Sequence, residues 1–162
     1  MTKMTKTAAQ LDRDIAAYLA EPEPLGRPIS RGPIGRGESL VEFSARVQRE
    51  ARARQKTLHQ AMLRHQALFV TDRRGRTTLL ILSGEMSHPD EGRYRVTKLL
   101  RDGPEGHVTR PTITRLAQDL ARDLSPDYIR PASEEDVAAW VSTPEYLDGS
   151  ERVLEMQRRN RR

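Results

Sequence analysis

Basic side chains in the first half of the chain have the spacing that points most directly to a chemistry. Seven of them fall into two sets. The first follows helical intervals of three, three and four residues and comprises Arg46, Arg49, Arg52 and Lys56. The second surrounds a turn glycine and comprises Arg73, Arg74 and Arg76. Guanidinium groups bind phosphate or guanine in bidentate fashion, and a two-stranded ribbon fits the DNA major groove. The two sets therefore predict a nucleic-acid-binding surface.

Other interpretations of the same residues stay open. The helical set also fits a solvated helix face, and the turn set also fits a charged loop that keeps a sheet edge soluble. Either set could instead contact an acidic protein surface. Like charges at these helical intervals repel by a few tenths of a kcal/mol per pair, so we expect anions or acidic side chains nearby.

The residue types that carry most enzymatic chemistry are sparse. The chain has no Cys and four His, and none of the H-E-x-x-H, Walker A, G-x-G-x-x-G or G-x-S-x-G motifs occurs. Among the histidines, His107 is the best candidate for a general acid or base, because it lies beside a tight turn that also holds Asp102 and Glu105. The sequence identifies no partner for this histidine. We therefore expect a protein that is not an enzyme, with no catalytic residues, no metal ligands and no cofactor.

Charge is distributed unevenly along the chain. Residues 1–80 hold 15 Lys/Arg and 8 Asp/Glu, a balance of +7, whereas residues 81–157 hold 9 and 15, a balance of −6. The last five residues add +4, and the whole chain carries +5. The basic half can attract nucleic acid or an acidic protein. It can equally pair with the acidic half of its own chain or of a second copy, which would make a homo-oligomer.

The location of the protein is inferred from what the sequence lacks. No apolar run approaches the ~18–20 residues that cross a bilayer. The first ten residues lack the continuous apolar segment of a secretory signal. Together with the absence of Cys, this favours a cytoplasmic protein with no membrane partner.

Apolar periodicity predicts the elements that would position the basic residues. The run 68–82 reads as a hairpin with its turn at Asp72–Gly75, and the strand signals continue to about residue 109. A long helix is expected over about 40–65 and C-terminal helices over about 112–157, the last of them interrupted or bent near Gly149. The predicted fold is α+β, a three-to-four-stranded antiparallel sheet (about 68–109) packed by the long helix on one face, with the C-terminal helices on the other face or at one end.

The N-terminal helix and the long helix are each expected to begin at a capping box, formed by Thr7 with Gln10 and by Ser39 with Glu42. Apolar residues at helical spacing on these two helices include Leu11, Ile15 and Leu19 on the first and Leu40, Phe43 and Val47 on the second.

Three segments are expected in the domain organisation. Residues 1–37 form an N-terminal helix and an arm, residues 38–157 a single α+β domain, and residues 158–162 a basic tail. The arm is rich in Pro and Gly from Glu21 to Gly37 and carries Arg27, Arg31 and Arg36, which suits either a tether or a basic arm that orders on a partner. These features give two hypotheses: a nucleic-acid-binding protein, or a protein-interaction and assembly subunit that oligomerises through the arm and complementary charges.

Overall fold

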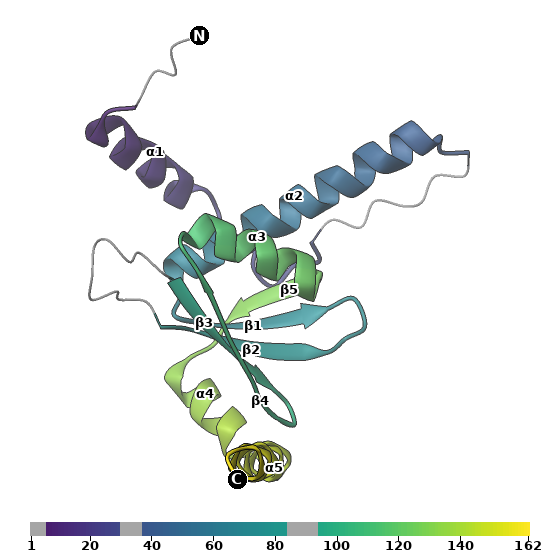
Figure 1. Ribbon diagram of the computed structural model, residues 1–162. Helices are drawn as coiled ribbons and strands as arrows, with labels where there is room; N and C mark the ends of the chain where they lie inside the picture. The colour runs from purple at the N-terminus through teal and green to yellow at the C-terminus, as the bar shows by residue number, and fades with distance from the viewer. Residues whose placement is uncertain (1–5, 30–36, 84–93) are drawn as a thin grey trace.

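The computed structural model describes residues 6–29, 37–83 and 94–162. Five strands form one antiparallel sheet in the order β4-β3-β2-β1-β5 (Figure 1). The strands are β1 (Ala67–Asp72), β2 (Thr77–Ser83), β3 (Tyr94–Leu100), β4 (Gly103–Arg110) and β5 (Pro126–Pro131). The helices are α1 (Ala8–Ala20), α2 (Leu40–Arg64), α3 (Ile113–Leu124), α4 (Glu134–Val141) and α5 (Pro144–Asn160).

The α+β class is confirmed, but the predicted strand count of three to four is one short. The missing strand is β5, which pairs with β1 at one end of the sheet. Its ends are Pro126 and Pro131, and the segment falls within the range predicted as C-terminal helices; its strand signal is weak because proline lacks the N–H that a ladder needs. Backbone N–H groups of Gly26 and Ile29 donate to the carbonyls of Ile129 and Asp127, so the outer edge of β5 is covered by part of the predicted arm.

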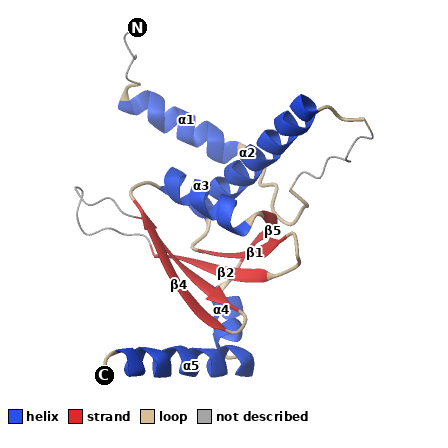
Figure 2. Ribbon diagram, turned by 45° about the vertical axis from the view of Figure 1, so that its right-hand side comes forward, coloured by secondary structure: helices blue, strands red, loops and turns tan. Residues whose placement is uncertain are grey.

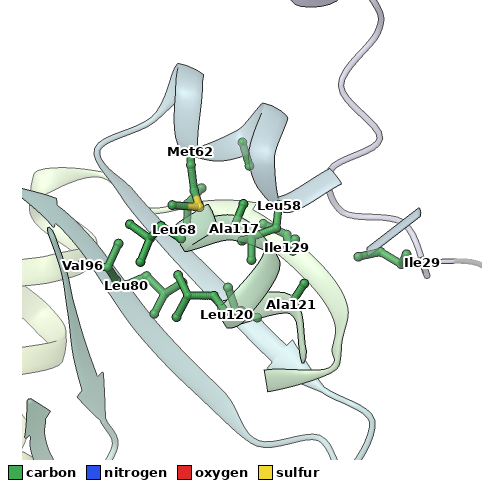
Figure 3. Close-up of a cluster of buried hydrophobic side chains, with 13 residues drawn as sticks. Ile29, Leu58, Met62, Leu68, Leu80, Val96, Ala117, Leu120, Ala121 and Ile129 are labelled. Atoms are coloured by element: carbon green, nitrogen blue, oxygen red, sulfur yellow. The ribbon is translucent and has the colours of Figure 1, made fainter. Parts of the chain in front are cut away.

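Two apolar layers enclose the sheet. On one face α2 and α3 cover the side chains of Leu68, Leu80 and Val96, and Ile29 packs into the same cluster (Figure 3). On the opposite face α4 and α5 cover Phe69 and Leu79. We had expected all the C-terminal helices on the face opposite the long helix or at one end. That expectation is wrong for α3, which lies beside α2 on the same side of the sheet (Figure 2), and its apolar side chains belong to the same buried cluster as those of α2.

Glycines allow one very close approach between α5 and the β3–β4 turn. A Cβ built on Gly149 would lie 1.4 Å from the backbone oxygen of Asp102, and one on Gly103 would lie 2.9 Å from the backbone carbon of Gly149. Gly103 also has φ +131°, which side chains rarely adopt. The helix expected to bend near Gly149 is instead continuous, and this glycine is its contact point with the sheet.

Candidate interaction surface

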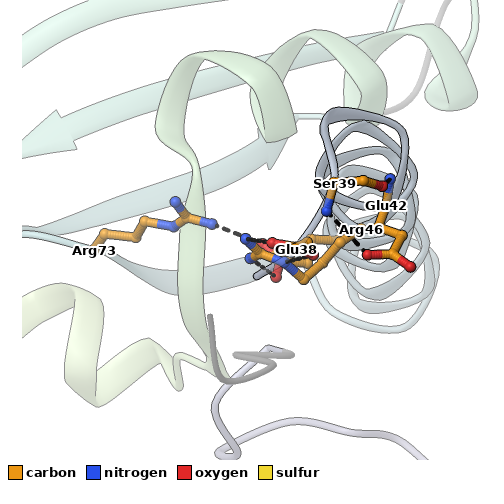
Figure 4. A network of polar contacts seen from close by, with 6 residues as sticks. Glu38, Ser39, Glu42, Arg46 and Arg73 are labelled. Atoms are coloured by element: carbon orange, nitrogen blue, oxygen red, sulfur yellow. Dashed lines mark hydrogen bonds and ion pairs between the residues drawn. The ribbon is translucent and has the colours of Figure 1, made fainter. Parts of the chain in front are cut away.

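The hairpin tip and the long helix meet, as the nucleic-acid hypothesis requires. Nη2 of Arg73, from the β1–β2 turn, lies 3.2 Å from Oε2 of Glu50 on α2 (Figure 4). Nη1 of Arg46 lies 3.2 Å from the other oxygen of Glu50. One member of each predicted basic set thus reaches the same point, and that point is a buried carboxylate.

Carboxylates from the same half of the chain neutralise this meeting point. Nη2 of Arg54 also lies 3.7 Å from Oε2 of Glu50. Arg46 donates two further hydrogen bonds to Glu38, of 3.0 and 3.1 Å, and this donation holds the pKa of the Glu38 carboxyl below its usual range. The acidic side chains that we expect near the basic residues of α2 are therefore present. They already offset part of the positive charge of Arg46 and Arg73.

Two more cations of the predicted basic sets, Lys56 and Arg76, form ion pairs with carboxylates other than Glu50. Nζ of Lys56 lies 2.9 Å from Oε2 of Glu21, and the hydrogen bond raises the pKa of the lysine and lowers that of the glutamate. Nε of Arg76 lies 3.0 Å from Oδ2 of Asp72. Within residues 6–29, 37–83 and 94–162, the remaining cations form no ion pair with a carboxylate; these are Arg49, Arg52 and Arg74.

An open groove at the hairpin ends carries balanced charge. It has a volume of about 990 Å³ and lies between the β1–β2 and β3–β4 turns. Its lining holds four cations, Arg76, Lys98, Arg101 and Arg130, and four carboxylates, Asp72, Asp102, Glu105 and Asp123. Arg76 pairs with Asp72, and Lys98 pairs with Glu105. Such a lining gives an anion no excess of positive charge to bind.

The histidine considered for catalysis has a basic neighbour. His107 lies on β4, and Nη2 of Arg95 donates to its Nδ1 at 3.1 Å. Among the described residues His107 forms no ion pair with a carboxylate, and no group of three or more acidic or histidine side chains is arranged to hold a metal ion.

Exposed apolar side chains lie on the two projecting helices α1 and α2. Within the described ranges, seven of the twelve exposed large apolar side chains belong to α1 and the first two turns of α2. We name two rows on these helices. The α1 stripe consists of Leu11, Ile15 and Leu19, and the α2 stripe consists of Leu40, Phe43 and Val47. Spacings of three and four residues place each row on one helical face.

Helix α1 is well formed although it buries none of its residues. Thr7 accepts from the backbone of Gln10, and the Gln10 side chain accepts from the backbone of Thr7, which completes the predicted capping box. Ile15 in the middle of the stripe is 51% exposed. An isolated helix of about 13 residues is marginal in water, so this helix needs a surface to pack against.

Among the described residues, the polar contacts between α1 and the rest of the domain are at the C-terminal end of this helix. The hydroxyl of Tyr18 lies 3.0 Å from Nδ1 of His59 and 3.3 Å from the carbonyl oxygen of Lys56. Burial lowers the pKa of His59, which favours the neutral ring that can accept this hydrogen bond. Arg64 donates to the backbone carbonyls of Leu19 and Glu21. The N-terminal turns of α1 then point away from the sheet (Figures 1 and 2).

The N-terminal half of α2 projects in a different direction. Ser39 and Glu42 form the second predicted capping box, and Leu40 just inside it is 86% exposed. Farther along the same helix, Leu58 and Ala61 are fully buried against the sheet and α3. The C-terminal half of α2 therefore belongs to the core, whereas its N-terminal half, which extends beyond the sheet in Figure 2, leaves its apolar side chains exposed. The sequence predicted which residues of α2 lie on its apolar side, but it did not predict that the domain leaves those at the N-terminal end of the helix exposed.

Comparison with known proteins adds no further constraint. No protein-family model, no curated protein and no solved structure matches this chain. Among the described residues, no helix combines the length and the apolar character needed to cross a membrane. The surface must therefore be interpreted from its own chemistry.

Proposed function

We propose that this protein is a non-enzymatic assembly subunit that self-associates through its projecting helices. The observation that supports this most is the exposure of the α1 stripe and the α2 stripe on helices that are otherwise regular and capped. Contiguous apolar surface of this kind marks association sites in soluble proteins. Full burial of an exposed apolar side chain contributes ~1.5–3 kcal/mol, and the side chains of the two stripes, which are 36–86% exposed, gain the corresponding part of it on association.

Sedimentation analysis of the full chain tests this proposal. The wild-type chain should sediment as an oligomer, and the double variant Leu11→Asp with Ile15→Asp should sediment as a monomer. The matched control, Ala9→Asp with Ala17→Asp, adds the same charge on the opposite side of α1, beside Arg13, and should keep the wild-type state. A wild-type chain that remains monomeric at high concentration would overturn the proposal.

Nucleic-acid binding is a second candidate, supported by a narrower set of residues than the sequence indicated. Arg49, Arg52 and Arg74 are exposed and form no ion pair with a described carboxylate, so they are the cations with charge to offer. Gel shifts at two salt concentrations test it. Binding should weaken when Arg49→Gln and Arg52→Gln are combined, but much less when Arg161→Gln and Arg162→Gln are combined. Absence of binding at about 50 mM salt, where electrostatic association is strong, would remove this candidate.

A further inference from the structure

We infer that the cleft where α1, α2 and α3 meet is a binding site for the phosphate group of a small ligand. The cleft has a volume of about 250 Å³, and polar side chains of all three helices line it: Tyr18, Arg52, Gln55, Lys56, His59 and Thr114. The three helices come together at this point in both views (Figures 1 and 2). The inference does not depend on the proposed self-association, because no residue of the lining belongs to the α1 stripe or the α2 stripe.

Helix α2 supplies most of the lining from one of its faces. Its four lining side chains stand at positions i, i+3, i+4 and i+7 of the helix, beginning with Arg52 and ending with His59. The His59 ring contacts both other helices. Its Nδ1 lies 3.0 Å from the hydroxyl of Tyr18 on α1, and its Nε2 lies 3.5 Å from the hydroxyl of Thr114 on α3. Polar groups from three helices therefore converge on one small space.

The lining carries positive charge without a carboxylate to balance it. None of the described residues that line the cleft is acidic, whereas the groove at the hairpin ends has as many carboxylates as cations. Arg52 forms no ion pair with a described carboxylate. Its neighbours three and four positions away on α2 are uncharged or basic: Gln48, Arg49, Gln55 and Lys56. An anion in the cleft would relieve the repulsion between Arg52 and Lys56, which are four residues apart.

Lys56 can turn toward the cleft because its present ion pair is exposed. Its Nζ lies 2.9 Å from Oε2 of Glu21, with the two side chains 53% and 47% exposed. Exposed ion pairs of this kind contribute little to stability. The same Nζ lies 5.9 Å from the centre of the Tyr18 ring, which is part of the lining. Lys56 can therefore exchange the Glu21 carboxylate for an oxygen of a ligand.

The size and the donors of the cleft suit a single phosphate group. The guanidinium of Arg52 offers bidentate donation, and the ammonium of Lys56 offers a point charge. The amide of Gln55 and the hydroxyl of Thr114 can donate to the remaining oxygens. Pockets for drug-sized ligands measure about 300–1,000 Å³, so a cleft of about 250 Å³ suits a phosphate group better than a whole nucleotide.

Titration of the full chain with inorganic phosphate, followed by nuclear magnetic resonance, tests the inference. At constant ionic strength, phosphate should shift the signals of the Arg52 guanidinium and the His59 ring until they saturate, and chloride should not. Arg52→Gln should raise the dissociation constant about tenfold, the effect of losing one charge-assisted hydrogen bond. Thr114→Val keeps the shape of the side chain and should raise it about threefold, as the loss of a neutral hydrogen bond does.

Arg49→Gln is the matched control. Arg49 is also an exposed cation of α2 without an ion pair to a described carboxylate, but it does not line the cleft. Its removal should change the dissociation constant by less than about twofold, because a charge outside the cleft is screened by salt.

Two outcomes would overturn the inference. Shifts that never saturate, or equal weakening by Arg49→Gln and Arg52→Gln, would mean a general attraction of anions to the basic side of α2. A short single-stranded oligonucleotide provides the second arm. If it binds through both arginines while inorganic phosphate does not saturate, the phosphates contacted belong to a nucleic-acid backbone and the cleft is not a site. The oligomeric state enters none of these measurements, so failure here and failure of the proposed self-association are separate results.

Discussion

Helices α1 and α3 have almost the same length and the same kind of N-cap, but α3 is the more strongly amphipathic and only α3 packs into the domain. Both begin at a threonine whose side chain accepts a backbone N–H, and both place apolar residues on one face. Helix α3 buries Leu116 and Leu120 at 0% and 1% exposure, whereas α1 has no buried residue. The comparison shows that an apolar row at helical spacing does not by itself predict whether the domain covers it.

Truncation of one leucine in each helix should give the largest contrast. Leu120→Ala should lower the free energy of unfolding by about 3 kcal/mol, because it removes a buried side chain and leaves a cavity. Leu11→Ala should change it by less than about 0.5 kcal/mol in dilute, dissociated protein, as surface substitutions do. Urea denaturation measures both values. Equal losses in the two variants at low concentration would mean that α1 packs on its own domain.

Gly149→Ala should reveal how closely α5 is packed, in contrast to α1. Alanine usually stabilises a helix interior by about 1 kcal/mol relative to glycine. Here the added Cβ would overlap the backbone of Asp102, so we expect a loss of about 3 kcal/mol, at the upper end of overpacking costs. Thermal or urea unfolding provides the measurement. A stabilised variant would show that α5 does not rest on the β3–β4 turn.

Glu50→Gln should destabilise the protein by about 2 kcal/mol, the range for losing hydrogen bonds between charged groups. The substitution keeps the shape of the side chain but leaves Arg46, Arg54 and Arg73 without their shared carboxylate. Glu155→Gln is the matched control, because its pair with Arg159 is exposed and should contribute at most about 1 kcal/mol. If the two variants are equally stable, Glu50 does not organise the arginines around it.

The smallest effect we expect is a pH dependence that arises where α3 meets β4. Arg110 donates to the Asp119 carboxylate and holds its pKa below the ordinary 3.8, and Arg115 and Arg122 act in the same direction. A lowered pKa in the folded state means that the stabilisation is present above pH 3.8 and is lost as the pH falls through the folded value. Asp119→Asn should therefore be less stable than wild type at neutral pH, with the difference shrinking below pH 3.8. Urea titrations across this range measure it, and a constant difference would contradict the assignment.

Local sequence signals predicted much of the fold. The capping boxes at Thr7 and Ser39 form as expected, and Gly75 takes the positive φ of 78° that the hairpin turn requires. Each of these depends on residues only a few positions apart. Strand β5 was missed because its pairing with β1 joins residues almost sixty positions apart and its ends are prolines.

The candidate site was less predictable because it depends on tertiary distances. The helical spacing of Arg46, Arg49, Arg52 and Lys56 predicted that these side chains share one side of α2. The ion pair between Arg73 and Glu50 was not predictable in this way, because it joins residues 23 positions apart and forms only when the hairpin folds onto α2. Likewise, the apolar positions of α1 and α2 were recognised, but their exposure follows from where the sheet ends. Whether Arg49, Arg52 and Arg74 contact phosphate stays a prediction.

Hydrogen exchange at several protein concentrations tests the central claim most directly, because it compares α1 and α3 in one sample. The claim is that a second copy covers the apolar face of α1. Amides of α1 should gain protection as concentration rises, since the isolated helix is marginal, while amides of α3 should be equally protected throughout. Protection of α1 that does not vary with concentration, whether high or absent, would contradict the account.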